Sequence, residues 1–307
     1  MSLFQQPARF MKRRVVIFGG TGQLGTDLVD VFAKSEDVDV VPLTHENADC
    51  TDAGAVRSLL LGTHPQIVIN SAAYVRVDDC EDHAREAFDV NAIGALNIAR
   101  ACAELGALCV YISTDYVFDG NKATAYVESD PACPINVYGA SKLAGEFLIR
   151  QTAPRWLIVR AASLFGRTGA KGKGGNFVET ILAKAKAGEA LTIVDDVRMS
   201  PTYTRDAASA LVLLLARGGE GIVHLTNDGA CSWYEFAKKA LELTGRRASL
   251  AAVSATEYPT RARRPKNSAL QSERALVELR SWQDALKAYL IEKGHISASL
   301  AVAVHEP

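Results

Sequence analysis

The feature that most constrains the fold is a regular alternation of apolar and amphipathic segments that starts at residue 13. The apolar segments are short and rich in Val, Ile and Leu, which is typical of strands buried on both faces, and each is followed by a segment with helical periodicity. Strands joined by helical crossovers predict an α/β fold, a Rossmann-type doubly wound parallel sheet with helices on both faces. The predicted strands are residues 13–20, 38–43, 65–73, 107–114 and 155–162, and the predicted helices are residues 22–33, 52–61, 83–105 and 137–150.

The pattern changes after residue 162, where a glycine-rich basic segment is followed by shorter helices and strands. A chain of 307 residues is long enough for two lobes. We therefore expect a leader or added tail, a dinucleotide-binding domain, and a smaller, discontinuous C-terminal substrate lobe that closes over the strand ends. The predicted division is 1–10 for the tail, 11–165 with return segments at about 191–228 for the dinucleotide-binding domain, and 166–190 with 229–307 for the substrate-binding lobe.

Charge and composition exclude several classes of protein. The formal net charge of -1 gives no general attraction to nucleic acid or to an anionic membrane. The longest apolar run, 207–216, is much shorter than the ~20 residues of a membrane span. Six scattered cysteines without metal-ligand spacing predict reduced thiols and no metal site. We expect a cytoplasmic protein without nucleic-acid or membrane partners, and a homodimer remains open.

A glycine-rich loop lies between the first predicted strand and the first predicted helix. Gly19, Gly22 and Gly25 have the spacing G-x-x-G-x-x-G. Glycines at this place allow a tight turn and let a pyrophosphate approach the helix N-terminus, where free N–H groups and the helix dipole favour anions. In this context the motif predicts dinucleotide binding rather than only a tight turn.

The end of the second strand bears on the choice of cofactor. An acidic residue there normally accepts a hydrogen bond from the ribose 2′-hydroxyl of NAD. This chain has Thr44 and His45 instead. Without that carboxylate nothing repels a 2′-phosphate, and either side chain offers it a hydrogen bond. The alternative, that both are ordinary loop residues, stays open. The residues therefore allow NADPH or NADH, with a slight preference for NADPH.

Tyr138 and Lys142 are four residues apart in a predicted helix, so they share one face. A neighbouring cation should lower the pKa of the tyrosine, which then passes a proton to a carbonyl oxygen. The spacing alone proves little, because Tyr234 and Lys238 repeat it. Position favours Tyr138, since its helix follows a strand that ends at Thr114.

The glycine loop and the segments STDYVFDG, NVYGASKLAGE, SPTYTRD and YPTRARRPKNS resemble the dTDP-4-dehydrorhamnose reductase family, a branch of the extended short-chain dehydrogenases/reductases. The resemblance extends from about residue 12 to residue 290. It implies an oxidoreductase of nucleotide-sugar biosynthesis that uses NADPH or NADH. The implied reaction reduces the 4-keto group of dTDP-4-dehydro-L-rhamnose to dTDP-L-rhamnose, with a dTDP-sugar as the partner.

The resemblance also implies roles for individual residues. Tyr138 would be the proton donor and Lys142 its partner and a ribose ligand. Thr114 would tune the tyrosine and contact the sugar, and Asp115 would hold the substrate. The positions implied for the pyrophosphate are Gly22, Gln23 and Leu24, those for the adenine side Asp49 and Cys50, and those for the nicotinamide half Ala72, Ala73 and Tyr111.

Two further features bear on the substrate. Arg263 and Arg264 lie in the family-like segment ARRPKNS and are interpreted as a clamp on the diphosphate, the alternative being a solvated basic turn. Ser163 stands where the family often has tryptophan, which affects the specificity for sugar and base. Lys171 and Lys173 are interpreted as solvated loop residues.

Two further residues are expected to have structural roles. His224 lies in an apolar segment and is expected in the core, while Trp233 follows a possible N-cap, Ser232, and is assigned to packing.

Two alternative functions remain. One is a non-catalytic, NADP-binding regulatory subunit resembling that of methionine adenosyltransferase, and the other is a different nucleotide-sugar reductase or epimerase. The intact Thr114, Tyr138 and Lys142 favour an enzyme, and Asp115 without a following Glu favours a reductase.

Overall fold

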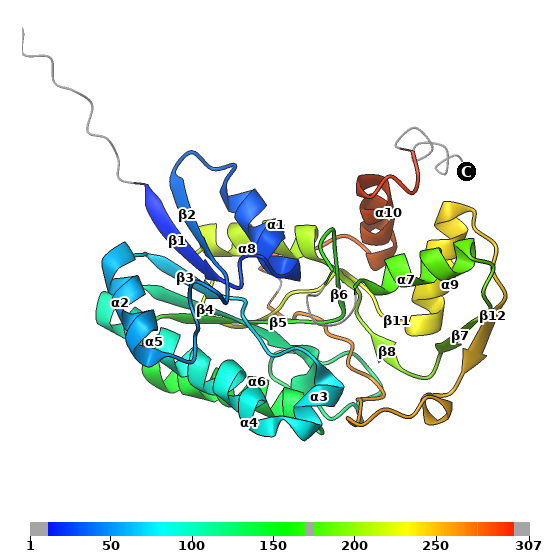
Figure 1. The fold of residues 1–307 in the computed structure, drawn as a ribbon, viewed down its shortest axis with the longest axis horizontal. Coiled ribbons are helices and arrows are strands. Elements are labelled where there is room, and N and C mark those ends of the chain that lie inside the picture. The colour runs from blue at the N-terminus through cyan, green and yellow to red at the C-terminus, as the bar shows by residue number, and fades with distance from the viewer. Residues whose placement is uncertain (1–11, 170–174, 275, 298–307) are drawn as a thin grey trace, which may run out of the picture.

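The computed structural model describes residues 12–169, 175–274 and 276–297, and its centre is a six-stranded parallel sheet (Figure 1). The strand order is β10-β5-β4-β3-β1-β2, so the chain starts at β1, goes first to the edge strand β2, and then crosses back to build β3, β4, β5 and β10 on the other side of β1. This confirms the predicted doubly wound α/β class. The strands are β1 (Arg13–Phe18), β2 (Val38–Leu43), β3 (Ile67–Asn70), β4 (Leu108–Thr114), β5 (Trp156–Ala161) and β10 (Gly221–His224).

Helices cover both faces of this sheet, as Figure 1 shows. On one face α1 (Gln23–Phe32) packs beside α8 (Thr204–Ala216), and on the other α5 (Gly94–Leu105) packs between α2 (Ala53–Thr63) and α6 (Val137–Thr152). Every residue of β4 is buried, as expected for a central strand covered on both sides. The two faces carry separate apolar cores.

The predicted helix at residues 83–105 is a continuous helical segment over residues 84–105, with a π turn inside it. The structure has α3 (Val77–Asp82) and α4 (Ala84–Phe88), then a π turn at Asp89–Ile93, before α5 begins. The π turn carries the fully buried Asn91, whose side chain hydrogen-bonds the backbone of the strand-end loop. Asn91 thus links the π turn to the loop that follows β3.

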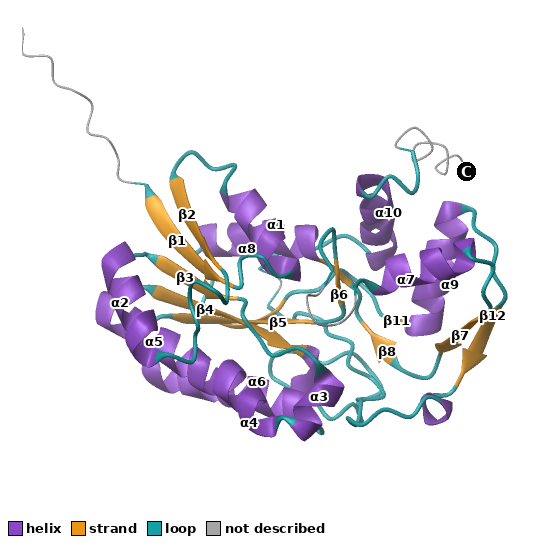
Figure 2. Ribbon diagram, in the orientation of Figure 1, coloured by secondary structure: helices purple, strands orange, loops and turns teal. Residues whose placement is uncertain are grey.

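The C-terminal lobe is a helical cluster edged by two-stranded sheets (Figure 2). Its aromatic-rich core joins three helices. They are α7 (Phe177–Lys186), α9 (Trp233–Thr244) and α10 (Trp282–Glu292). The paired strands are β6 (Leu164–Phe165) with β9 (Thr202–Tyr203), β8 (Arg198–Met199) with β11 (Cys231–Ser232), and β7 (Leu191–Val194) with β12 (Leu250–Val253). Two 3-10 turns complete the elements, η2 (Asp115–Val117) and η3 (Ala255–Glu257).

The chain passes between the lobes several times. After α7 the chain returns to the large sheet, where α8 packs beside α1 and β10 pairs with β5. Within the predicted return segment, 191–228, β7 instead pairs with β12 in the C-terminal lobe.

Some expectations fall outside the described residues, namely those for the tail at 1–10 and for Lys171 and Lys173.

Among the helices that the structure describes, none is long and apolar enough to cross a bilayer. None of the six cysteines, all of which are described, is in a disulfide.

Candidate active site between the lobes

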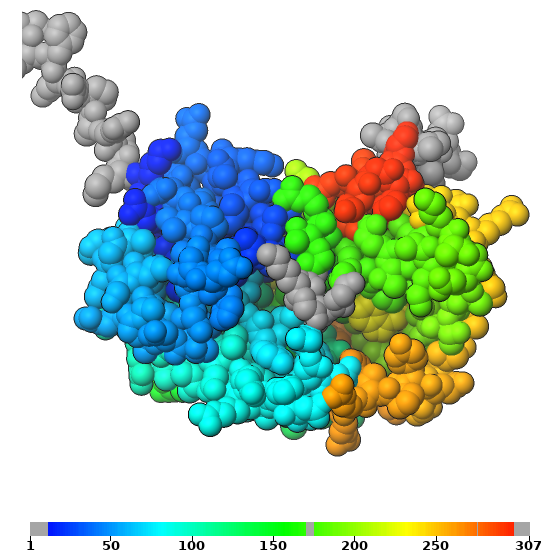
Figure 3. Space-filling view, viewed as in Figure 1, coloured from blue at the N-terminus to red at the C-terminus, as the bar shows by residue number. Residues whose placement is uncertain are grey.

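A cavity of about 800 Å³ lies at the carboxyl ends of the large sheet's strands and reaches into the C-terminal lobe. Figure 3 shows the two lobes side by side, with the blue to cyan residues in one and mainly green to orange residues in the other. Ligands of doubly wound sheets bind at this edge, where the strand order reverses. Here the strand order reverses between the neighbouring strands β1 and β3, and the loops that follow them, at residues 19–24 and 71–77, form part of the wall.

The glycine loop is closely packed against the loop after β3. Gly19 has a φ of +72°, and a Cβ atom there would be 2.8 Å from the backbone nitrogen of Ala72. A Cβ atom on Gly25 would be 2.0 Å from the carbonyl oxygen of Gly19. Gly22 is the N-cap of α1 and provides no side-chain cap, and it lines the cavity together with the first residues of the helix. The N–H groups at this helix end therefore suit a phosphate.

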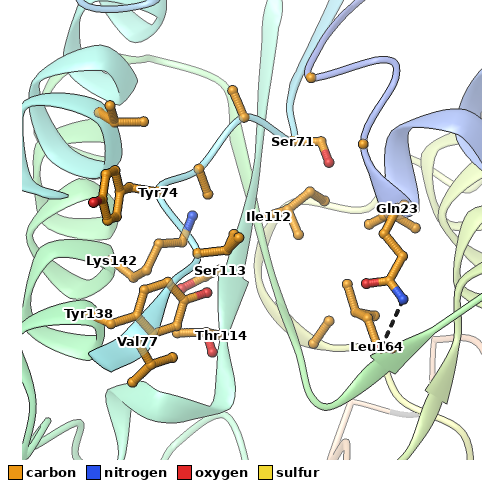
Figure 4. Close-up of a pocket in the computed structure, with 18 of the residues that line it drawn as sticks. Gln23, Ser71, Tyr74, Val77, Ile112, Ser113, Thr114, Tyr138, Lys142 and Leu164 are labelled. Atoms are coloured by element: carbon orange, nitrogen blue, oxygen red, sulfur yellow. Dashed lines mark hydrogen bonds between the residues drawn. The ribbon is translucent and has the colours of Figure 1, made fainter. Parts of the chain in front are cut away.

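Gln23 connects the glycine loop to the segment after β5. Its Nε2 donates to the carbonyl oxygen of Leu164 at 3.1 Å, and Figure 4 shows this bond on the side of the cavity away from Tyr138. The bond joins residues 141 positions apart and so ties the two halves of the wall together.

The part of the cavity predicted for the adenine includes His45, Asp49 and Cys50. Asp49 Oδ1 accepts hydrogen bonds from the amide (2.9 Å) and hydroxyl (2.8 Å) of Thr51, which lower the pKa of the Asp49 carboxyl. The carboxylate is therefore charged and fixed. Thr44, in contrast, is not part of the cavity wall; its amide donates to the side chain of Asn47.

Tyr138, Lys142 and Thr114 come together on the opposite wall (Figure 4). The two α6 residues are one turn apart, and Thr114 is the last residue of β4. Gly139 allows the helix to approach closely, because a Cβ atom there would be 2.0 Å from the carbonyl oxygen of Tyr116. Tyr116 in turn contacts the Tyr138 ring edge-on, with the ring centroids 6.0 Å apart.

The protonation of this pair differs from the sequence-based expectation. Burial raises the pKa of the Tyr138 phenol above its ordinary value, and the hydrogen bond with Thr114 offsets only part of that rise. Burial also lowers the pKa of Lys142 to about 7, against the opposing effect of the Glu146 charge. The predicted lowering of the tyrosine pKa is therefore wrong for this structure, because desolvation dominates.

A buried ion pair lies behind the Tyr138–Lys142 face. Glu146, one turn after Lys142, accepts from Arg160 Nε at 3.0 Å and from its Nη2 at 2.7 Å. Ser113, next to Thr114, donates its hydroxyl to Glu146 Oε1 at 2.5 Å. The side chains of Glu146 and Arg160 are only 2% and 4% exposed, so this network rigidly connects α6, β4 and β5.

Tyr111 does not reach the cavity, contrary to the nicotinamide-side position predicted for it. It is fully buried, and its hydroxyl donates to the carbonyl oxygen of Asn91 at 2.7 Å. Its ring lies 3.9 Å from Lys142 Nζ. Tyr111 lies three residues before the end of β4, and its ring packs beneath Lys142 instead of lining the cavity.

The predicted arginine clamp is also set back from the cavity. Arg264 forms a two-pronged ion pair with Asp78, through bonds of 3.1 and 2.9 Å, and also hydrogen-bonds Tyr116, which does line the cavity. The Arg263 side chain is exposed, and its carbonyl accepts from Asn136 at 2.8 Å.

Most predicted site residues nevertheless line this one cavity. Those that do are Gly19, Gly22, Gln23, Leu24, His45, Asp49, Cys50, Ala72, Ala73, Thr114, Asp115, Tyr138 and Lys142. Those that do not are Gly25, Thr44, Tyr111, Arg263 and Arg264. Ser163, in the left-handed region at φ 42°, is also part of the wall. Sequence reasoning missed Trp233 and Phe177, for which the signal was an aromatic residue directly after each helix N-cap.

Comparison with known proteins identifies relatives of the whole chain. Residues 13–294 match the family model described as the RmlD substrate binding domain. The chain is 39% identical to the spore coat polysaccharide biosynthesis protein SpsK of Bacillus subtilis, over 91% of this chain and 98% of that protein. It is 35% identical to a dTDP-4-dehydrorhamnose reductase of Sinorhizobium fredii, over 89% of this chain and 95% of that protein.

A solved structure agrees with these relatives. The crystal structure of a dTDP-4-dehydrorhamnose reductase from Bacillus anthracis in complex with NADP superposes with a TM-score of 0.86. The two sequences are 37% identical, and the match covers 92% of this chain and 100% of the other.

Proposed function

Because the chain belongs to the dTDP-4-dehydrorhamnose reductase family, we propose that it reduces the 4-keto group of dTDP-4-dehydro-L-rhamnose to dTDP-L-rhamnose, with NADPH or NADH as the reductant. The observation that carries this proposal is the meeting of a phosphate-binding glycine loop and the Thr114, Tyr138 and Lys142 side chains in one cavity. The product is an activated deoxysugar of nucleotide-sugar biosynthesis.

The residues present fit a dinucleotide. Gly22 and Gln23 offer the helix N-terminus to the pyrophosphate, and Gly19 could not carry a side chain without meeting Ala72. Asp49 and His45 line the part of the cavity that would hold the adenine side of the cofactor, and Lys142 would bind the nicotinamide ribose. When bound, the reduced nicotinamide supplies the hydride that the 4-keto carbon receives.

Tyr138 would supply the proton to the sugar oxygen. Its raised pKa keeps the phenol protonated at neutral pH, which is the form a proton donor needs. Thr114 hydrogen-bonds this phenol and would orient it toward the carbonyl. A charged Lys142 would then stabilise the phenolate that forms, because it lies on the same helical face.

The substrate would lie between the sheet and the C-terminal lobe, formed by residues 166–190 and 229–307. Asp115, buried and on the cavity wall, would accept a sugar hydroxyl. Arg264 would neutralise the diphosphate after leaving Asp78, with Tyr116 as the link to the cavity. The free thiols support a reducing compartment, the cytoplasm.

A non-catalytic NADP-binding subunit is less well supported, because a protein without turnover does not require a proton donor such as the protonated tyrosine beside Thr114 and Lys142. Replacing Tyr138 with Phe tests the proposal directly. We expect kcat to fall about 10²- to 10⁴-fold, since the ring remains and the proton donor is lost. The assay follows the loss of nicotinamide absorbance with dTDP-4-dehydro-L-rhamnose as substrate.

Tyr234→Phe is the matched control, because Tyr234 also precedes a lysine by four residues but lies outside the cavity wall. It should leave kcat unchanged. Cofactor affinity should be nearly the same in both variants. Reduction that survives Tyr138→Phe undiminished would contradict the mechanism, and a wild type without turnover would favour the regulatory subunit.

A further inference from the structure

The C-terminal lobe contributes an aromatic pair to the cavity wall. Trp233 and Phe177 both line the cavity and contact each other edge-to-face, with their ring centroids 4.8 Å apart at an interplanar angle of 61°. Both are half-buried, so each keeps part of its surface accessible. We propose that this pair binds the planar pyrimidine base of the sugar nucleotide. The proposal rests on the proposed function, because it takes the substrate to be a nucleotide.

The two rings are held firmly in place before any ligand binds. Trp233 is the first residue of α9, whose N-cap Ser232 forms a reciprocal capping box with Glu235. Phe177 is the first residue of α7, whose N-cap Asn176 is buried and also donates to the carbonyl oxygen of Gly166 at 2.9 Å. A wall fixed in this way loses little conformational entropy on binding.

The pair also rests on the core of its lobe. Phe177 stacks on Phe236, with centroids 5.9 Å apart at 12°, and Phe236 is 1% exposed. Phe236 in turn contacts Trp282 at 5.7 Å. The row of rings thus runs from the buried core to the cavity surface. A bound base would cover the exposed faces of the two rings at its end, Phe177 and Trp233.

The order of groups along the cavity places the base at this end. The glycine loop and Asp49 define the cofactor side, and the reacting sugar must lie at Tyr138. A sugar nucleotide anchored there extends its nucleotide away from the cofactor, toward the C-terminal lobe. Phe177 and Trp233 are the aromatic residues that this lobe presents among the described lining residues.

The charge distribution agrees with this placement. The charged or titratable side chains of the described wall, such as Asp49, Asp115 and Lys142, come from the large-sheet lobe. The described lining residues from position 163 onward are uncharged. An uncharged aromatic surface suits the face of a base, which stacks on aromatic rings, rather than a charged phosphate.

The tryptophans provide a direct optical test. All three of them, Trp156, Trp233 and Trp282, are described, and Trp233 is the one that lines the cavity. Titrating dTDP, which carries the base but no sugar, into the wild-type protein should quench tryptophan fluorescence. The quench should persist in Trp156→Phe and disappear in Trp233→Phe. A quench that Trp233→Phe retains in full would overturn the proposal.

Calorimetry with dTDP measures the energetic contribution. Trp233→Ala should raise the Kd for dTDP between about 5-fold and about 150-fold, the range expected for removing one stacking ring. The Kd for NADPH should stay unchanged, which also shows that the variant is folded. An unchanged Kd for dTDP would refute the base site; should Trp233→Ala not fold, the fluorescence of Trp233→Phe decides.

The two proposals can fail separately. A wild type that neither binds dTDP nor reduces the 4-keto sugar would contradict both the proposed function and the base site. A wild type that does both, but whose dTDP affinity is indifferent to Trp233→Ala, would contradict the base site alone.

Discussion

At the residue scale, Lys142 has the most unusual environment. Its amine is buried against the ring of Tyr111, and Glu146 is the acidic side chain that most strongly favours its charged form. Because Glu146 is itself paired with Arg160, the lysine has only part of a counter-charge. An amine with a pKa of about 7 is charged below neutral pH and neutral above it.

This environment predicts a pH dependence of activity. If charged Lys142 is required, kcat/KM for the cofactor, which reports the free enzyme, should fall as the pH rises above about 7. The paired replacement Glu146→Gln and Arg160→Gln keeps hydrogen-bonding groups in the network but removes the charge that raises the lysine pKa. It should therefore move the falling limb to lower pH. A limb that stays at the same pH would show that Glu146 does not tune Lys142.

At the scale of elements, the local signals in the sequence were sufficient for most of the site. Gly22, Thr114 and Tyr138 lie at strand ends or at the start of helices, where the parallel topology brings them to one edge. What the sequence could not show depends on packing. Asn91 in the π turn hydrogen-bonds a loop that is distant in sequence, and Trp233 reaches the cavity only through the packing of the C-terminal lobe against the large-sheet lobe.

The close packing of the glycine loop between β1 and α1 predicts that even a methyl group added there affects stability and cofactor binding. Gly25→Ala should destabilise the protein by about 1–3 kcal/mol and weaken NADPH binding, because its Cβ would press on the Gly19 carbonyl and shift the phosphate loop. Gly62→Ala is the control, a helical glycine in α2 with nothing within 4 Å of the added Cβ, and should stabilise by roughly 0.5–1 kcal/mol. Urea unfolding and NADPH titration measure both. Equal effects of the two variants would contradict the role given to loop packing.

At the scale of the whole molecule, ion pairs join the two lobes. Arg264 and Arg261 of the C-terminal segment bind Asp78 and Asp82, which lie on α3. Each Arg264–Asp78 partner is about one-third exposed, so the pair contributes little stability, roughly 0–1 kcal/mol. Because this ion pair is weak, a more strongly charged anion such as a diphosphate can replace Asp78 as the partner of Arg264.

Arg264→Ala should therefore raise KM for the sugar nucleotide roughly 10- to 100-fold, as expected for losing a charged hydrogen-bond donor, while the Kd for NADPH stays the same. Arg57→Ala is a matched control, because Arg57 pairs with Glu104 on α5 through its Nε and Nη2 atoms, outside the cavity wall. Steady-state kinetics separates the two variants. If KM does not respond to Arg264→Ala, the arginine is only a tie between the lobes.

The position of β10 at the edge of the large sheet has a consequence for the protein's synthesis. β5 ends at Ala161, but the strand that covers its outer edge is made only when the ribosome reaches Gly221–His224, after α7 and α8. Until then the growing chain carries an open strand edge, which can pair with other chains. The nucleotide-binding half thus cannot finish folding on its own as it emerges, and chaperones that shield nascent chains should matter most in the interval between these two strands.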